Sequence, residues 1–388
     1  MSGMAAEDEE GPIAGRHATN LELFLDLVFV FAVTQIASLI SHHPTGTGTA
    51  KGLLIATLVW WQWGQFTWAG SALDLQRTGR IRLLVLGCIP VTLIMTISIP
   101  GAFHGSGLWF GGAYLGVQLL VLGMLGSVSL GDPARRLGFV GYASVASIAP
   151  VMVLLGGFVH GNTRVVIWVF AGVLDVIAGL RASNGEWVVD PVHFSERHSL
   201  FVIISLGEVL VAAGASASEV GLDWLTATAI VVSVGVACAL WWAYFAFIPA
   251  VGEHGLSHTH GVDRGAFARD VFTFGHLPLV FGIILYAVVV KHLVPEPDGH
   301  LAADDRWLLA LGVVCFVAGL LAIQFRVVHR LAPERIVAIP VAVAISAVGK
   351  FLPGLVVVAA IAVLLIVMQA ITWRRFRADA MAELTTNR

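Results

Sequence analysis

The sequence predicts an all-α polytopic membrane protein with about twelve transmembrane helices, arranged as two parallel six-helix pseudo-repeats. The first reason is composition: 57% of the residues are apolar and 12% are charged, whereas a soluble chain is roughly 45–50% apolar and 25% charged. The mean hydropathy of +0.87 points the same way. The second reason is a series of long apolar stretches, and the third is a set of motifs that recurs in the second half of the chain.

The apolar stretches mark the individual helices. A transmembrane helix needs about 20 predominantly apolar residues, and the first such stretch opens with Asn20–Phe31 and continues to Ile40. The spans predicted in the first half are 21–40, 51–72, 81–101, 107–129, 137–159 and 163–181. Those in the second half are 198–217, 223–249, 268–291, 306–326, 333–350 and 353–373.

The distribution of Lys and Arg predicts the orientation of these spans. Cytosolic loops of membrane proteins carry an excess of both residues, and with twelve spans 17 of the 22 lie on the side of the N-terminus and 5 on the other. We therefore expect a cytoplasmic-membrane protein with both termini in the cytosol. Residues 1–15 form an acidic tail without the basic start of a signal peptide and are expected to be disordered; residues 376–388 form a second cytosolic tail.

Four motifs recur in the same order in the two halves, at separations of 181, 182, 181 and 188 residues. Two halves with an even number of spans share one topology, so an axis along the membrane normal would relate them. We predict a first half at 16–181, a cytosolic connector at 182–196 and a second half at 197–375. The matched motifs are Arg16-His17 with Arg197-His198, Asp26 with Glu208, Trp60-Trp61 with Trp241-Trp242, and Gly87–Pro90 with Gly275–Pro278.

Composition and motifs argue against several function classes. The net charge of −3 and the lack of any Lys/Arg run argue against a nucleic-acid partner. The three cysteines lie inside apolar spans and are expected to be buried thiols without disulfides. The chain has no phosphate loop, no HExxH and no GxSG serine. We expect no enzyme, no cofactor and no metal; the expected partners are the lipid bilayer, a proton or small cation and a small solute, and a homo-oligomer is left open.

Carboxylates inside the spans are the first candidates for function, because charge inside a membrane is costly and marks a functional site by default. At ~1.5 Å per residue, Asp26, Glu208 and Asp175 lie roughly 9–15 Å inside the cytosolic ends of their spans. No Lys or Arg lies deep in a span to neutralise them, so we predict a shared acidic cavity that binds a proton or cation. Alternatively, each acid is held by local hydrogen bonds or stays protonated because it is buried. Glu22 is expected at the cytosolic mouth, or as a first-turn acid favoured by the helix dipole.

Four further residues are candidates for a proton relay or an inner gate. His276 precedes Pro278, whose ring leaves a carbonyl one turn earlier unpaired, and a histidine there relays protons or satisfies local groups. Glu196 and Arg197 belong to a dense titratable cluster that leads into the seventh span. Asp74 marks the cytosolic end of the connection between the second and third spans, where an ordinary loop charge is the alternative.

Tryptophans near the middle of the second span suggest a pocket. Trp60, Trp61 and Gln62 fall near mid-membrane, away from the interface where an aromatic belt would lie. Trp241 and Trp242 are their counterparts in the second half. We predict that these five side chains line a pocket; helix packing is the alternative.

Two motifs resemble those of a known family. Residues 22–30, Glu-Leu-Phe-Leu-Asp-Leu-Val-Phe-Val, and residues 196–208, from Glu-Arg-His to Leu-Gly-Glu, are similar to the bacterial low temperature requirement protein A (LtrA) family. The resemblance covers about residues 15–375 and implies a multi-spanning bacterial membrane protein, in a family named for a cold-growth phenotype. A looser likeness links the chain to potassium channels built from two six-helix repeats. It is an analogy only, because Phe24-Leu25-Asp26 stands where those channels have Phe-Ser-Asp.

The leading functional hypothesis is a transporter-like protein in which Asp26 and Glu208 face each other near the pseudo-axis. They would bind a proton or cation reversibly, coupled to a small solute and, as the resemblance implies, to cold adaptation. The first alternative is an ion channel of two six-helix repeats, which needs a continuous polar pathway. The second is a non-transporting membrane sensor or scaffold, which predicts fully hydrogen-bonded acids that no cavity reaches.

Overall fold

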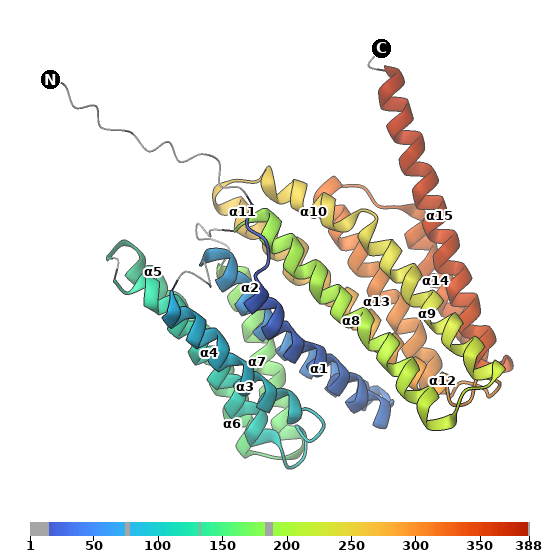
Figure 1. Cartoon of the computed structure of the whole chain (residues 1–388), viewed down its shortest axis with the longest axis horizontal. Helices are drawn as coiled ribbons and strands as arrows, with labels where there is room; N and C mark the ends of the chain where they lie inside the picture. The colour runs from blue at the N-terminus through green and yellow to red at the C-terminus, as the bar shows by residue number, and fades with distance from the viewer. Residues whose placement is uncertain (1–14, 74–77, 132, 183–188, 387–388) are drawn as a thin grey trace.

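A computed structural model describes residues 15–73, 78–131, 133–182 and 189–386, and every regular element within them is a helix (Figure 1). The elements are α1 (Asn20–His42), α2 (Gly46–Ala72), α3 (Gly79–Ile97), α4 (Gly107–Ser129), α5 (Pro133–Ala146), α6 (Ile148–Phe158), α7 (Gly161–Ala182), α8 (Pro191–Val220), α9 (Trp224–Phe245), α10 (Ile248–Ser257), α11 (Gly261–Ala268), a π-helical turn η1 (Arg269–Phe274), α12 (Gly275–Leu293), α13 (Ala303–Val328), α14 (Pro333–Val348), a 3₁₀ turn η2 (Gly349–Phe351) and α15 (Gly354–Thr386).

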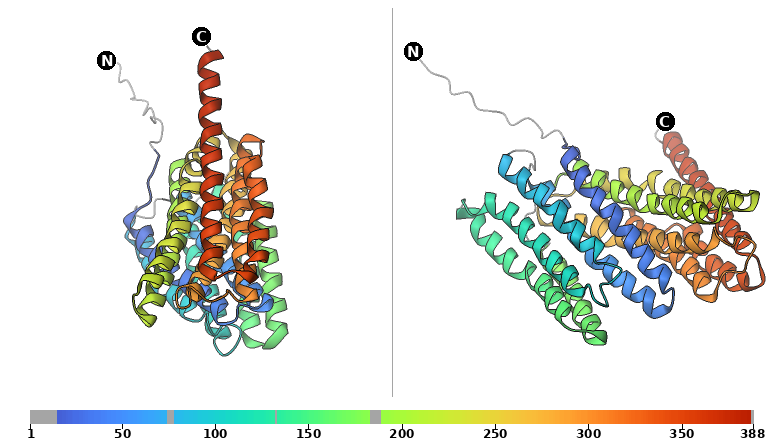
Figure 2. Two further views of the ribbon diagram at one scale, coloured as in Figure 1. Left: turned by 90° about the vertical axis from the view of Figure 1, so that its right-hand side faces the viewer. Right: turned by 60° about the horizontal axis from the view of Figure 1, so that its bottom comes forward.

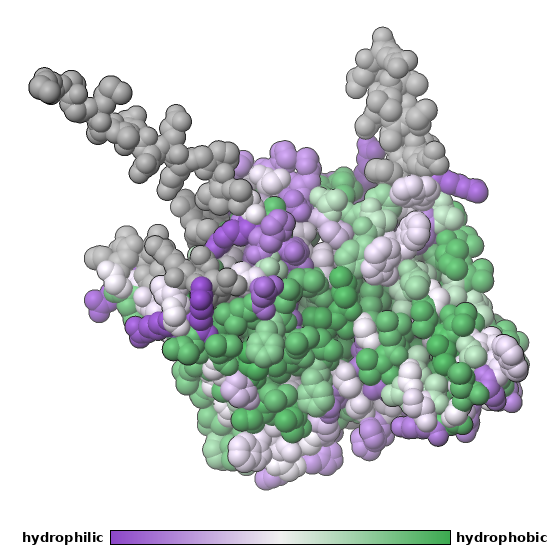
Figure 3. All heavy atoms as spheres, viewed as in Figure 1, coloured by the Kyte–Doolittle hydropathy of each residue, from purple (hydrophilic) through white to green (hydrophobic). Residues whose placement is uncertain are grey.

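Ten helical segments of the described chain are long and apolar enough to cross a membrane. Helices also lie at the two remaining predicted spans, but α14 has only 16 residues, and α2 carries glutamines, glycines and threonines among its apolar residues. The polytopic helical class is therefore confirmed, while the twelve-span count and the repeat stay predictions. Figure 3 shows the outer surface this class requires, with a broad apolar belt between polar side chains at two opposite edges.

Three helices form the centre of the bundle. Helices α1, α8 and α12 pack against one another, and we call their shared contact the central seam. In Figure 1, α3 to α7 lie on one side of α1, and α9 and α13 to α15 lie on the far side of α8. Helix α1 begins and α15 ends on the same face of the bundle, called here the N-terminal face. Figure 2 shows the last turns of α15 extending beyond the other helices on that face.

Close glycine contacts hold α12 against α13. A Cβ atom on Gly282 would lie 2.5 Å from the Gly312 carbonyl oxygen, so the two backbones touch without intervening side chains. Small residues give such close approach in membrane proteins, where van der Waals packing between helices replaces the hydrophobic effect. Helix α12 is enclosed by its neighbours: in an apolar stretch of 18 residues within 263–293, 78% of the residues are buried.

A π turn leads directly into α12 and contacts α2. In the π register the Thr273 carbonyl would accept the backbone N–H of Pro278, but proline has none. The Trp60 indole N–H donates to that carbonyl instead, at 3.1 Å. This bond joins α2 to the turn before α12, and Trp60 is 2% exposed.

A buried arginine lies at the face of the bundle opposite the N-terminal face, called here the opposite face. Arg164 is 1% exposed and donates to five backbone carbonyl groups at 2.6 to 3.2 Å, with no carboxylate among them. These carbonyls, which lie at and just beyond the ends of α3 and α6, belong to Ala102, His104, Gly156, Gly157 and Val159. Arg164 therefore satisfies chain ends that helix bonds leave open.

The predicted connector is shorter in the structure. Helix α8 begins at Pro191, whose N-cap Asp190 accepts the N–H groups of Val192 and His193, so the last residues of 182–196 are helical. Residues 1–14, which make up nearly all of the first predicted tail, lie outside the described residues, as does Asp74.

Candidate functional site

The first turn of α1 brings Glu22 against α8. The Thr19 N–H and hydroxyl both donate to Glu22 Oε2 at 2.9 Å, which forms a capping box. The other carboxylate oxygen lies 2.9 Å from His193 Nε2. Glu22 is 2% exposed and lies 4.0 Å from the Nε of Arg197. Glu22 is therefore both the predicted first-turn acid and a contact between two helices.

Asp26 forms an ion pair with Arg197. The Arg197 Nη2 donates to Asp26 Oδ1 at 2.8 Å, and its Nη1 donates to Oδ2. The Trp63 indole N–H donates to Asp26 Oδ1 at 3.1 Å, and the guanidinium lies 5.7 Å from the centre of the Trp63 ring. Asp26 and Arg197 are 3% and 0% exposed. This bidentate, fully enclosed pair suits the planar donor fork of arginine.

The prediction that no cation lies deep in a span is therefore wrong. It rested on a seventh span that starts at residue 198, whereas α8 starts at Pro191 and carries Arg197 almost two turns inward. Arg197, predicted as a relay or gate, is instead the counterion of Asp26.

Glu208 has a different counterion. Lys291 Nζ lies 3.0 Å from Glu208 Oε1 and donates to the Ser38 hydroxyl at 3.1 Å. The Thr34 hydroxyl donates to Glu208 Oε2. The Glu208 side chain is 1% exposed, but that of Lys291 is 18% exposed. Lys291 is the last residue of the predicted span 268–291 and lies in the last turn of α12, toward the opposite face.

Asp26 and Glu208 do not face each other. Asp26 and Thr34 are eight positions apart on α1, and Arg197 and Glu208 are eleven apart on α8, which is ~12 Å and ~16 Å at ~1.5 Å per residue. Because Asp26 pairs with Arg197 and Thr34 with Glu208, α1 and α8 run parallel and the acids occupy different levels. The predicted face-to-face arrangement is wrong, and buried apolar side chains, including Phe29 and Phe201, lie between the levels.

A further pair continues the Glu208 cluster toward the opposite face. His292 Nδ1 lies 2.6 Å from Asp305 Oδ1, and His292 Nε2 lies 2.8 Å from the Ser41 hydroxyl. The His292 side chain is 27% exposed and that of Asp305 is 7% exposed. A series of polar groups therefore runs from the partly exposed His292, near the opposite face, inward to the buried Glu208.

Glu196 joins the segment before α1 to α8. Its Oε2 accepts the Ala18 N–H at 2.8 Å and lies 3.3 Å from His17 Nδ1. At the start of α8, Arg16 lies against the N-cap Asp190, whose Oδ2 accepts the Arg16 N–H at 2.9 Å. Glu196 is therefore placed at the N-terminal face, next to Glu22 and His193 rather than beside Glu208.

His276 lies in an aromatic cluster beside the Asp26 pair. Its Nε2 is 2.8 Å from the Tyr244 hydroxyl, and its Nδ1 is 3.0 Å from the Val271 carbonyl of the π turn. Its ring centre is 5.2 Å from that of His198, which packs against Trp63 with ring centres 5.0 Å apart. His276 thus satisfies a local carbonyl and also contacts a second buried histidine.

The predicted tryptophan pocket is not formed. Trp60 is enclosed by packing, with its ring 5.2 Å from Phe201, and Trp61 packs beside Phe274 at 6.4 Å. Trp241 and Trp242 are 48% and 55% exposed on the outer surface, so they line nothing inside the bundle. The matching doublets therefore occupy different environments in the two halves.

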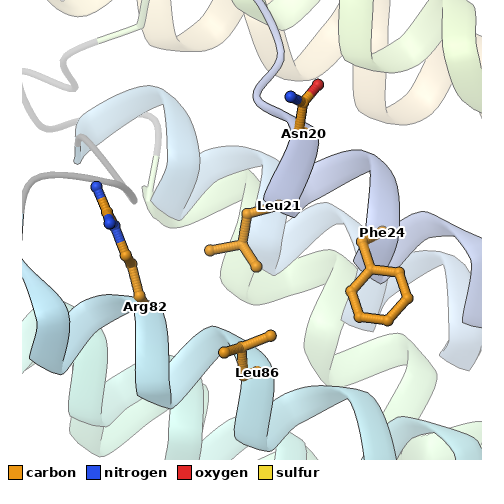
Figure 4. A pocket seen from close by; sticks show the side chains of 5 residues that line it. All are labelled: Asn20, Leu21, Phe24, Arg82 and Leu86. Atoms are coloured by element: carbon orange, nitrogen blue, oxygen red, sulfur yellow. The ribbon is translucent and has the colours of Figure 1, made fainter.

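A shallow, open groove lies on the surface of the described part of the chain. It has a volume of about 360 Å³ and lies between the first turns of α1 and α3 (Figure 4). Its lining, which includes none of the predicted site residues, is Asn20, Leu21, Phe24, Arg82 and Leu86.

Asp175 lies apart from the seam, in a polar cluster of the first half. Its Oδ2 accepts the Tyr114 hydroxyl at 3.2 Å, and it is 4% exposed. Gln62, on α2, is fully buried against this tyrosine. Its neighbour Trp63 points to Asp26, so α2 stands between the two clusters. The predicted single cavity holding all the acids is therefore wrong.

Several residues of the site were not predicted, chiefly His193, Trp63, Thr34, Lys291 and Tyr114. One available signal was Asp190-Pro191, since an N-cap aspartate followed by proline marks a helix start. Reading it would have placed His193 and Arg197 inside α8. The other partners depend on which helices are neighbours and left no local signal.

Comparison with known proteins gives one family. The model of the bacterial low temperature requirement A protein (LtrA) family matches residues 17–370. An uncharacterized protein of Rhizobium meliloti (strain 1021) is 31% identical over 327 residues, which cover 80% of this chain and 78% of that protein. No solved structure matches the chain significantly.

Proposed function

The chain belongs to the bacterial low temperature requirement A (LtrA) family, and from this premise we propose that it is a transporter-like membrane protein that exchanges a proton at Glu208. The observation that carries the proposal is the pair of buried ion pairs at two levels of the central seam, Asp26 with Arg197 and Glu208 with Lys291. Buried ion pairs contribute little net stability, and ionisable residues inside a membrane mark ion and proton pathways.

The two pairs have different roles in this proposal. Asp26 is held by the two Nη groups of Arg197 and by Trp63, with no exposed partner, so it acts as a fixed lock between α1 and α8. Glu208 is held by Lys291, which is partly exposed, and by the Thr34 hydroxyl, a group that can either donate or accept. A proton that reaches Glu208 removes its charge and weakens its attraction to Lys291.

Loss of that attraction supplies the conformational step. With Glu208 neutral, Lys291 is free to turn toward the opposite face and its solvent, and α8 is no longer tied to α12 at this level. Coupling a small solute to this release gives secondary transport, with the proton as the driving ion. In this proposal the N-terminal face, with its excess of Lys and Arg, lies in the cytosol. The activity would support growth at low temperature, a role taken from the family's name alone.

A proton-flux assay tests the proposal directly. The purified chain is reconstituted into liposomes that contain a fluorescent pH indicator, and a pH step is applied outside. Glu208→Gln is expected to abolish protein-dependent proton movement, because the amide cannot release a proton at this site. Glu219→Gln is the matched control: it makes the same change on the same helix at an exposed position. Unchanged flux in Glu208→Gln would refute the role of Glu208.

A non-transporting sensor or scaffold is the second candidate. It is favoured by the complete bonding of Asp26 and by the location of the groove, whose lining contains neither acid. Absence of any protein-dependent flux in the wild type, across several membrane potentials, would favour this candidate. An ion channel is disfavoured by the apolar layer between the two levels; single-channel currents in planar bilayers would support it.

A further inference from the structure

We propose that Asp175 is a second proton-binding site, built by α2, α4, α5 and α7 and separate from the central seam. Asp175 is 4% exposed on α7 and accepts the Tyr114 hydroxyl of α4 at 3.2 Å. On the same side, the Tyr142 hydroxyl of α5 donates to Gln65 Oε1 of α2. This site would extend the proposed proton coupling to the first half of the chain, and its role in transport rests on that proposal.

Within the described ranges, Asp175 has no cation beside it to neutralise a carboxylate, which favours its protonated form. Among the side chains that the structure describes, the titratable groups that face Asp175 are Tyr114 and Tyr142, and α2 contributes the amides of Gln62 and Gln65. Helix α6, which also packs against α7, has no titratable residue in its sequence. No Lys, Arg or His side chain forms an ion pair with Asp175 among the described residues. A buried carboxylate without a cation is far costlier than the neutral acid.

The cluster can hold the carboxyl group in both of its forms. A phenol or an amide can donate or accept a hydrogen bond, so the same neighbours serve a carboxylate and a carboxylic acid. Gln62 is 0% exposed, yet neither of its amide atoms makes a hydrogen bond of ordinary geometry. Buried polar groups are normally paired, so this open amide is the group available to a water or to the acid as the proton leaves and returns.

The occupant is a proton rather than a metal ion or a solute. The Tyr114 and Tyr142 hydroxyl groups bond directly to Asp175 and Gln65, so direct side-chain contacts fill the space that a larger ligand would need. Helix α2 keeps the site independent of the seam, because Gln62 faces Tyr114 while the adjacent Trp63 donates to Asp26. Successive residues on a helix point ~100° apart, so one helix can wall off both clusters.

Infrared spectroscopy of the full chain in lipid at neutral pH tests this assignment. A protonated carboxyl group gives a C=O stretch that a carboxylate lacks. We expect Asp175→Asn to remove one such band and Asp26→Asn to remove none, because the two Nη donors of Arg197 stabilise the carboxylate form of Asp26. A spectrum without a protonated-carboxyl band at neutral pH, or a band that Asp175→Asn leaves in place, would overturn the proposal.

Two further measurements complete the test. Tyr114→Phe keeps the carboxyl group and removes its donor, so the band should shift to higher frequency; this variant decides the matter even if Asp175→Asn does not fold. Replacing sodium and potassium with choline should leave the band unchanged, and a band that forms only without alkali ions would identify a metal-ion site instead. The band should survive in Glu208→Gln. Since the spectrum needs no transport, its result stands whether or not the flux assay succeeds.

Discussion

Asp26→Asn is expected to destabilise the protein by about 3 kcal/mol, near the lower end of the roughly 3–5 kcal/mol lost when one partner of a buried ion pair is removed. The variant leaves Arg197, which is 0% exposed, without its bidentate acceptor. The lower end applies because Glu22 lies 4.0 Å from Arg197 Nε and offsets part of the lost attraction. The asparagine oxygen can still accept the Trp63 indole N–H.

A double-mutant cycle with Arg197→Gln separates the pair from its surroundings. Removing both charges leaves no unpaired ion, so the double variant should be more stable than the sum of the single effects predicts, by at least about 1 kcal/mol. Reversible unfolding in mixed detergent–lipid micelles measures all three variants, and the exposed Asp304→Asn serves as the control. Single effects that add within about 0.5 kcal/mol would refute an energetically coupled pair.

Three other perturbations test the packing and the caps. Arg164→Lys offers three donors in place of five to the carbonyls at the opposite face, so we expect a loss of about 1–3 kcal/mol in the same unfolding assay. Gly282→Ala would place its methyl group 2.5 Å from the Gly312 carbonyl oxygen and should cost about 1–3 kcal/mol or more, whereas Gly235→Ala, with nothing within 4 Å, should be near neutral. Asp223, in the loop before α9, accepts a first-turn N–H at 2.7 Å, which lowers its pKa. Its cap is therefore present above the unfolded-state pKa and is lost as the pH falls through the folded-state pKa, so Asp223→Ala should speed hydrogen exchange at the start of α9 at neutral pH but not in strong acid.

The sequence identified the candidate acids better than their surroundings. Asp26, Glu208 and Asp175 are all buried, as the cost of charge in a membrane led us to expect. Each has a different neighbour, however: an arginine, a lysine and a tyrosine. The proposed roles follow from those neighbours: Asp26 as a fixed contact between helices, Glu208 as the site of proton exchange and Asp175 as a second proton-binding site.

The tryptophan doublets show a limit of the motif comparison. Trp60 donates a hydrogen bond inside the bundle, while Trp241 and Trp242 face outward. A shared sequence position in two halves does not ensure a shared environment, because each position is covered by different neighbouring helices. Trp60 reaches the π turn before α12, whereas Trp241 and Trp242 lie on the outer surface.

The sequence by itself determined the class of the protein and the approximate limits of its helices. A bilayer requires long apolar helices with satisfied backbone groups, so composition and hydropathy are sufficient to recognise them. Which cation neutralises which acid was decided only by the tertiary structure. Arg197 meets Asp26 because α8 starts at Pro191 and runs parallel to α1, and Lys291 meets Glu208 because α12 packs against both. These contacts join residues more than 80 positions apart, so no local sequence pattern predicts them.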